Sequence, residues 1–182
     1  MTTDRFSAIQ LATRAHRHSH GCKAYTFEDG PALTAIAATS KARRILELGT
    51  ALGYTACCLA AGNPNSMVDT IEGDKEHVLL AREQIASVGL STRIIVHHGD
   101  FTKVLPTLAS GYDLVFFDGY EPDMRTLRVL TQMLNSGGTL VCGNLGLADN
   151  SNTLLEYLND NAIWNKANPI EGGATIVRIK RP

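Results

Sequence analysis

The stretch RRILELGTALGYTACC, residues 43–58, decides the fold of this chain. It begins as a short apolar run that contains one acidic residue, Glu47, and the run stops at Gly49. Gly53 follows four residues later, before a segment of small and aromatic side chains. Glycine adopts backbone angles that are closed to other residues, and it lets a ligand approach the backbone closely. The stretch therefore predicts a buried strand, a tight turn at which a ligand binds, and a helix.

Four more short apolar runs follow along the chain, separated by segments of helical period. In residues 74–88, Val78, Ala81 and Ile85 recur at the spacing of one helical face. Residues 122–134 show the same period, so a helix is expected there with Pro122 in its first turn. Strands that alternate with helices form right-handed βαβ units and a parallel sheet. The expected parallel strands are 43–49, 66–72, 93–99, 112–118 and 138–144.

The C-terminal end departs from this alternation. After a helix expected near 151–161, the runs AIWNKAN and GGATIVRIK are separated only by the PIEGG segment. Two strands so close in sequence cannot be joined by a helix, so we expect an antiparallel pair at the sheet edge. The whole pattern predicts an α/β fold of the Rossmann-like, doubly wound type. Its mostly parallel sheet of seven strands ends in a C-terminal antiparallel hairpin.

Length and composition favour one globular domain. A chain of 182 residues with 44% hydrophobic side chains fits a single domain, 1–182. We expect residues 1–40 to form a helical cap with helices at 4–18 and 31–40, and residues 43–182 to form the core. The net charge of −1 and the absence of a Lys/Arg block argue against nucleic acid or an anionic membrane as partner. No apolar run approaches the roughly 18 residues of a membrane span, and MTTDRFSAIQ is no signal peptide, so a cytoplasmic protein is expected.

Acidic residues stand at or near the ends of four successive expected strands. They are Glu47, Glu72, Asp100 and Asp118. Ligands of doubly wound sheets bind beyond the carboxyl ends of the strands, where Glu72 is placed to accept both hydroxyls of a ribose. Asp100 is placed to accept from an adenine amino group, although helix capping is the alternative for Asp100 and Asp118. A cofactor that carries a ribose, an adenine and an amino acid would use all four carboxylates, and S-adenosylmethionine is such a molecule.

Four motifs resemble those of the small class I S-adenosylmethionine-dependent O-methyltransferases, the family of catechol and caffeoyl-CoA O-methyltransferases. They are ILELGTALGYTACCLA, TIEGDKEHVLLAREQI, YDLVFFDGYEPD and PIEGGATIVRIK, and the likeness runs from about residue 25 to residue 182. The resemblance implies methyl transfer to an oxygen of a small-molecule acceptor by a homodimeric enzyme. It places Glu47 at the methionine ammonium, Glu72 at the ribose, and Asp100 with Phe101 at the adenine. The full cofactor-binding set is Glu47, Gly49, Thr50, Gly53, Tyr54, Thr55, Glu72, Gly73, Asp100, Phe101 and Asp118.

The resemblance also implies three metal ligands, of which this chain keeps two. The aspartate after the fourth strand corresponds to Asp118, but the Asp-Asn pair after the fifth strand reads Gly143-Asn144. The family's lysine, which helps to deprotonate the acceptor, falls at Glu121. Since Mg²⁺ prefers charged oxygen ligands, Asp118 and Asn144 form a weak metal site unless Glu121 turns inward, and a metal-independent reaction is favoured. The catalytic candidates are Asp118, Glu121 and Asn144, and the general base is Glu121, Asp118 or a histidine of residues 16–20.

Three other functions stay open at this point. An NAD-dependent oxidoreductase would also use Glu72, but the spacing Glu-x-Gly-x-x-x-Gly is not Gly-x-Gly-x-x-Gly. A nucleic-acid base N-methyltransferase would carry an Asn/Asp-Pro-Pro-aromatic stretch where this chain has DGYE, residues 118–121. A non-catalytic S-adenosylmethionine-binding protein of the same fold would share every cofactor motif.

The histidines and aromatic residues outside these motifs allow two interpretations each, and the cysteines allow one. On a helix, His16 and His20 lie one turn apart and are able to bind a metal. The alternative is a solvated helix end, where the dipole favours them. Tyr25, Phe27 and Trp164 either stack on an acceptor or pack within the protein. The cysteines show no metal-binding spacing and are expected to be buried free thiols; they are Cys22, Cys57, Cys58 and Cys142.

Overall fold

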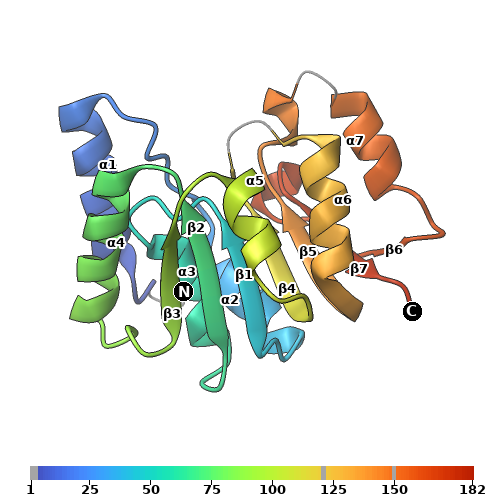
Figure 1. Ribbon diagram of the computed structural model, residues 1–182, viewed down its shortest axis with the longest axis horizontal. Coiled ribbons are helices and arrows are strands. Elements are labelled where there is room, and N and C mark those ends of the chain that lie inside the picture. The colour runs from blue at the N-terminus through green and yellow to red at the C-terminus, as the bar shows by residue number, and fades with distance from the viewer. Residues whose placement is uncertain (1–3, 120–121, 149–150) are drawn as a thin grey trace.

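A computed structural model of the chain describes residues 4–119, 122–148 and 151–182. A single sheet of seven strands runs through the molecule in the order β3-β2-β1-β4-β5-β7-β6 (Figure 1). Strands β1 to β5 pair in parallel, whereas β7 is antiparallel to both β5 and β6. The strands are β1 (Arg44–Leu48), β2 (Met67–Glu72), β3 (Ile94–His98), β4 (Tyr112–Phe117), β5 (Leu134–Cys142), β6 (Trp164–Lys166) and β7 (Ile176–Lys180).

The sheet confirms the predicted architecture, including the antiparallel pair at the C-terminal edge. The strand order reverses direction between β1 and β4, which are direct neighbours in the sheet. In doubly wound sheets, ligands bind at this switch point beyond the carboxyl ends of the strands. The fold therefore places its candidate site where β1 ends at Leu48 and β4 ends at Phe117.

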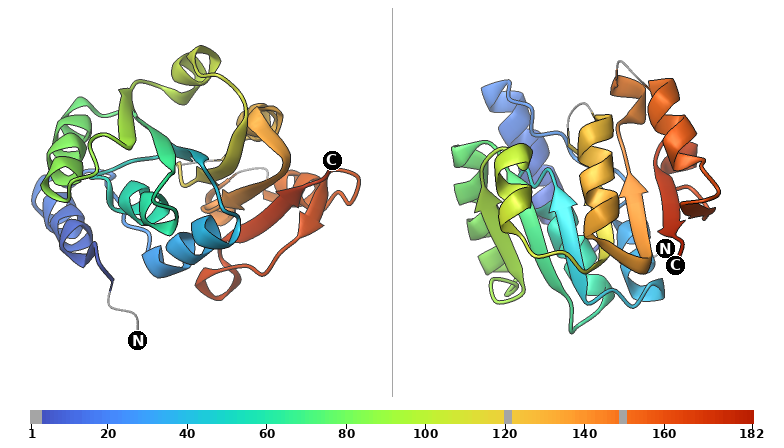
Figure 2. Two further views of the ribbon diagram at one scale, coloured as in Figure 1. Left: turned by 90° about the horizontal axis from the view of Figure 1, so that it is seen from below. Right: turned by 45° about the vertical axis from the view of Figure 1, so that its right-hand side comes forward.

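Helices cover both faces of the sheet, α1 to α4 on one face and α5 to α7 on the other (Figure 2). Alternate residues of each central strand serve the two cores: Ile45 faces the first group and Leu46 the second. Short 3₁₀ turns η1 (Leu105–Thr107), η2 (Leu145–Leu147) and η3 (Glu171–Gly173) complete the fold. The helices are α1 (Ser7–His20), α2 (Gly30–Thr39), α3 (Tyr54–Gly62), α4 (Lys75–Ser87), α5 (Phe101–Val104), α6 (Met124–Met133) and α7 (Ser151–Leu158).

Two of the predicted element boundaries are wrong. Helix α6 begins at Met124, because Asp123 caps it: the two carboxylate oxygens accept from the Thr126 amide at 2.9 Å and from the Thr126 hydroxyl at 2.5 Å. Pro122 therefore precedes the cap and does not lie in the first turn. Strand β5 begins at Leu134, four residues before the apolar run that predicted it, because Leu134 pairs with Tyr112 of β4; the pairing then shifts register and resumes between Thr139 and Leu114.

The cysteines follow the sequence prediction, with one difference in burial. All four are free thiols, and Cys57, Cys58 and Cys142 are buried, while Cys22 is half-buried at the end of α1. Among residues 4–119, 122–148 and 151–182, no helix has both the length and the apolar character that a bilayer crossing requires.

Candidate functional site

A hollow lies at the switch point between β1 and β4. Its floor is the turn of residues 49–52 with the first residues of α3, and Asp118 closes one side. Thr13 of α1 and the segment 25–27 cover it from the N-terminal region. The space left inside is about 10 Å³, room for about one water molecule.

The turn requires glycine at its two key positions. Gly49 has φ of 95°, and a Cβ there would lie 3.1 Å from the backbone oxygen of Asp118. Gly53 has φ of 93° and immediately precedes α3, and a Cβ there would meet the Ile85 side chain at 3.1 Å. These glycines bring the free N–H groups at the start of α3 to the hollow, where they favour a negatively charged ligand group such as a carboxylate.

Glu47 is completely buried beneath this turn, and one of its oxygens lacks a partner. Its Oε2 accepts from the Thr70 hydroxyl at 2.6 Å, and Thr70 in turn contacts the Thr50 hydroxyl at 2.6 Å. Within the described ranges, Oε1 of Glu47 accepts no hydrogen bond. Since Thr50 lines the hollow, the chain of two hydroxyls connects the buried carboxylate to the site. An unpaired buried carboxylate oxygen is costly, so the site is built for a further donor or a cation.

Burial raises the pKa of Glu47 to about 8. The hydroxyls of Thr55 and Thr70 offset part of the rise, and the negative charges of Asp118 and Glu72 add to it. The carboxylates of Glu72 and Asp118, from the ends of the two strands that flank β1, therefore act on Glu47 around the glycine turn. A positive ligand charge near them lowers the free energy of the ionised state.

Glu72 lies at the end of β2 and fixes the turn from the neighbouring strand. Its Oε2 accepts from the Ala51 amide at 2.8 Å, and its Oε1 accepts from the Asp74 amide at 2.9 Å. Ala51 has φ of 45°, a conformation that non-glycine residues rarely adopt, so the Glu72 contact holds a strained residue in place. Each carboxylate oxygen keeps a second lone pair, which leaves the group able to accept from a ribose hydroxyl. Gly73 follows it with open space where a side chain would be.

Asp100 follows β3, in an exposed position, and caps α5. Its Oδ1 accepts from both the amide and the hydroxyl of Thr102, at 2.8 and 2.5 Å. These two hydrogen bonds lower its pKa. The neighbouring Phe101 ring packs edge-on against Phe117 and lies over Gly119, where a Cβ would be only 2.6 Å from it. The capping alternative is thus correct for Asp100, and its second oxygen remains available to an adenine.

Asp118 and Asn144 form the pair at the ends of β4 and β5. The Asn144 amide nitrogen donates to Asp118 Oδ1 at 3.0 Å and to the Asp118 backbone oxygen at 3.2 Å. The pKa of Asp118 is raised to about 7, mainly by burial. The negative charge of Glu171 contributes to the rise, and the Asn144 hydrogen bond offsets part of it. Asp118 is no helix cap, since Asp123 caps α6, so the capping alternative is wrong for this residue.

The donor set at this pair does not fit a divalent cation. Two oxygens of Asp118 surround the amide nitrogen of Asn144, which turns an N–H group, and not the amide oxygen, toward the carboxylate. A Cβ at Gly143 would lie 3.0 Å from Asp118 Oδ1, so the position of the missing carboxylate is closely packed. Hard cations need several oxygen ligands, and the described residues here offer one free carboxylate oxygen. Glu121, the remaining candidate, lies outside the described residues.

The other aromatic and hydroxyl candidates separate into two groups. The Tyr54 ring is buried and its hydroxyl donates to Asp4 Oδ2 at 2.5 Å, which ties the start of α3 to the N-terminal segment. Phe27 and Trp164 are core residues. Tyr25 is 59% exposed, lines the hollow, and carries the Arg17 guanidinium 3.7 Å above its ring. Of the three predicted stacking residues, Tyr25 and Phe27 line the hollow, whereas Trp164 belongs to the core on the other face of the sheet.

Sequence reasoning missed two residues of the site. Thr70 connects Glu47 to the hollow, and only its inward position on β2 distinguishes it from other threonines. Glu171 acts on Asp118 from the η3 turn, where Thr175 donates to it at 2.7 Å. Glu171 was visible only as part of the PIEGG linker, which carries no periodic signal.

Comparisons with known proteins agree with this geometry. A family described as methyltransferase domain matches residues 46–145. A catechol O-methyltransferase of Mycobacterium tuberculosis is 33% identical over 125 residues, which cover 67% of this chain and 57% of that protein. A catechol O-methyltransferase of Niastella koreensis is 31% identical over 125 residues, with 66% and 57% covered. The chain thus spans less than two thirds of the length of these curated relatives.

Solved structures share the fold over nearly the whole chain. The O-methyltransferase TomG from Streptomyces achromogenes, in complex with SAM, has a TM-score of 0.81 at 21% identity, covering 100% of this chain and 91% of that one. The O-methyltransferase from Bacillus cereus, in complex with SAH, has a TM-score of 0.81 at 17% identity, covering 96% and 91%. At these identities the likeness establishes the fold alone.

Proposed function

Because the chain belongs to the methyltransferase domain family that matches residues 46–145, we propose that it is an S-adenosylmethionine-dependent methyltransferase. We propose an oxygen of a small molecule as the methyl acceptor. The names of the catechol O-methyltransferase relatives support this choice. The glycine turn, whose spacing differs from that of dinucleotide sites, argues against the NAD-dependent alternative.

The observation that carries the proposal is the group of three carboxylates around the hollow. Glu47 is fully buried, Asp118 is held in place by Asn144, and Glu72 braces the glycine turn. No lysine or arginine among the described residues forms an ion pair with any of them. S-adenosylmethionine brings an ammonium and a sulfonium, so its binding supplies the positive charge that this site lacks.

In this proposal the protein positions the acceptor against the cofactor and accepts the acceptor's proton. When bound, the cofactor supplies an already activated methyl group, so the protein mainly aligns the acceptor oxygen with it. The Gly49 turn and the start of α3 hold the amino-acid end, and Glu72 accepts from the ribose. We propose that Asp118, whose pKa burial raises to about 7, takes the acceptor proton. Asn144 orients that carboxylate through its hydrogen bond at 3.0 Å.

We propose that the reaction needs no divalent metal. The support is the orientation of the Asn144 amide and the close packing at Gly143, which together leave too few oxygen ligands. The resemblance to the O-methyltransferases also leads us to propose a cytoplasmic homodimer. Light scattering on the purified chain tests the dimer directly.

The test is an incubation of the purified protein with methyl-labelled S-adenosylmethionine and a panel of catechols, phenols, amines and thiols. Parallel reactions contain EDTA, or EDTA followed by Mg²⁺. We expect a labelled methyl ether in the presence of chelator, at a rate that added Mg²⁺ does not raise. Methylation of amines or thiols alone would exclude the oxygen assignment, and rescue by Mg²⁺ would exclude the metal-free reaction. Cofactor binding without any product would identify a non-catalytic binding protein.

A further inference from the structure

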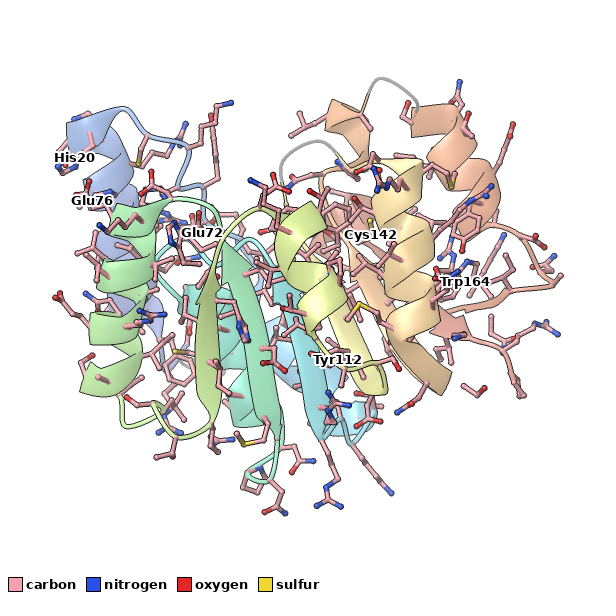
Figure 3. The ribbon with its side chains drawn as sticks, in the orientation of Figure 1. His20, Glu72, Glu76, Tyr112, Cys142 and Trp164 are labelled. Carbon is pink, nitrogen blue, oxygen red and sulfur yellow. The ribbon has the colours of Figure 1, made fainter. Side chains whose placement is uncertain are left out.

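A second cluster of reactive side chains lies where α1 ends and α4 begins. One ligand atom each of His16, Cys22 and His77 lies within 4.8 Å of the others, and the same holds for His16, His20 and Glu76. Figure 3 shows His20 at the end of α1 beside Glu76 at the start of α4. None of these residues lines the hollow between β1 and β4.

The local backbone explains why these groups converge. His16 and His20 lie one turn apart on α1, and their rings stack with centroids 4.3 Å apart. Gly21 ends the helix in the left-handed conformation, with φ of 61°, and its amide donates to the Arg17 oxygen at 2.9 Å. This reversal returns the chain and brings Cys22 back beside His16. On the other helix, His77 is buried in the first turn of α4 and meets the His16 ring edge-on at 5.3 Å.

Two of the ligand groups make no other hydrogen bond among the described residues. For the part of the chain that the structure describes, neither the His16 ring nor the Cys22 thiol has a hydrogen-bond partner. His20 Nδ1 lies 3.0 Å from the backbone oxygen of His16. The Ser19 hydroxyl lies 2.9 Å from the same nitrogen. When Nδ1 donates to the His16 oxygen, the lone pair of Nε2 is free, the arrangement found in metal-binding histidines. Packing alone does not require two imidazoles and a thiol within 4.8 Å of one another, with a third imidazole stacked beside them.

We propose that His16, Cys22 and His77 bind a Zn²⁺ ion, with His20 or Glu76 as the fourth ligand. A mixed nitrogen and sulfur set suits Zn²⁺, whereas a thiolate disfavours Mg²⁺ and Ca²⁺. With Zn–N of about 2.0 Å and Zn–S of about 2.3 Å, ligand atoms of a tetrahedral site lie roughly 3.3–3.8 Å apart. Side-chain rotations that close the cluster by about 1 Å are enough to reach that geometry.

The site would fasten the N-terminal cap to the edge of the cofactor hollow. His77 Nδ1 lies 3.8 Å from Glu72 Oε1, and Glu72 holds the Ala51 turn. Helix α1 carries Thr13, which covers the hollow. Zn²⁺ binding therefore fixes α1 on α4 beside the proposed ribose acceptor. This consequence rests on the proposed function, but the metal site itself does not.

The experiment uses the full chain without an affinity tag, freed of metal by chelator and titrated with Zn²⁺ in a calorimeter. We expect one Zn²⁺ per chain and at least a tenfold loss of affinity in His16→Ala. His18→Ala is the matched control, since His18 lies on the same helix but outside the cluster, and it should bind as the wild type does. Circular dichroism of each variant separates loss of binding from loss of folding.

Co²⁺ provides an independent readout on the same protein. We expect the visible absorption of a four-coordinate site together with a thiolate-to-cobalt charge-transfer band, and Cys22→Ser should abolish that band. Absence of stoichiometric Zn²⁺ binding, equal loss in His18→Ala, or a charge-transfer band that survives Cys22→Ser would overturn the proposal. Failure of cofactor binding with intact Zn²⁺ binding would instead count against the proposed function alone.

Discussion

Replacing Glu47 with glutamine should change how the stability of the cofactor-free protein depends on pH. The substitution keeps the shape of the side chain and removes its titration. In the folded protein, burial raises the pKa of this carboxyl from 4.5 to about 8. The folded state therefore holds one more proton than the unfolded state between these two values. The stability that this proton contributes is complete below pH 4.5 and is lost as the pH rises through 8.

The magnitude follows from linkage. One proton of difference changes the free energy of unfolding by about 1.4 kcal/mol per pH unit. Between pH 5.5 and 7.5, the wild-type protein should therefore lose about 3 kcal/mol relative to Glu47→Gln. Such a change is a large fraction of the total stability of a domain of this size.

The assay is urea unfolding of both proteins, without cofactor, at half-unit steps across this pH window. The difference between the two unfolding free energies cancels the contributions of most other titrating groups. Glu83→Gln, an exposed glutamate on α4, serves as the control, and its profile should run parallel to the wild type. A difference between wild type and Glu47→Gln that stays constant within about 0.5 kcal/mol would refute the assigned burial and its electrostatic cost.

Three further predictions test other parts of the site. Glu72→Ala should weaken S-adenosylmethionine binding by about 10- to 100-fold in calorimetry, because the variant loses both the ribose acceptor and the hydrogen bond to the Ala51 amide. Unchanged affinity would exclude Glu72 as the ribose acceptor. Gly49→Ala should lower the free energy of unfolding by roughly 2 kcal/mol more than Gly89→Ala in urea titrations. Both glycines have positive φ, but only at Gly49 would a Cβ lie 3.1 Å from a backbone oxygen. Equal losses in the two variants would contradict this close approach. The kcat of the wild type should rise with pH through about 7, where Asp118 loses its proton. Asp118→Asn should lower kcat by roughly 10²- to 10⁴-fold. A kcat that does not change with pH would exclude Asp118 as the base.

The sequence was most informative where a single physical pattern governs the structure. The apolar runs that became β1 and β4 were clear because both strands are buried on both faces, and the alternation in the last run marked the antiparallel β7. The glycines of the turn were equally clear, since their positive φ excludes other residues. The early start of β5 was hidden, because Leu134 pairs with Tyr112 of β4 ahead of a register shift, and the polar residues 135–137 fall inside that irregularity.

The site was harder to read than the fold, because side-chain partners are set by tertiary contacts. The acidic positions at the strand ends were identified, yet their different environments were not. Asp100 is exposed and caps a short helix, whereas Asp118 is buried and bonded to Asn144. The contact of Thr70 with Glu47 joins two strands 23 residues apart, and the influence of Glu171 on Asp118 spans 53 residues. No local pattern in the sequence encodes such pairs.

The central claim is that the hollow between β1 and β4 binds S-adenosylmethionine. Isothermal titration of the purified chain with S-adenosylmethionine, S-adenosylhomocysteine and NAD tests it most directly. We expect one molecule of either sulfur compound to bind per chain, with proton release on binding of S-adenosylmethionine near pH 7.5 as Glu47 ionises beside the cation. Binding of NAD alone, or the absence of binding by both sulfur compounds, would contradict the assignment of this hollow to S-adenosylmethionine.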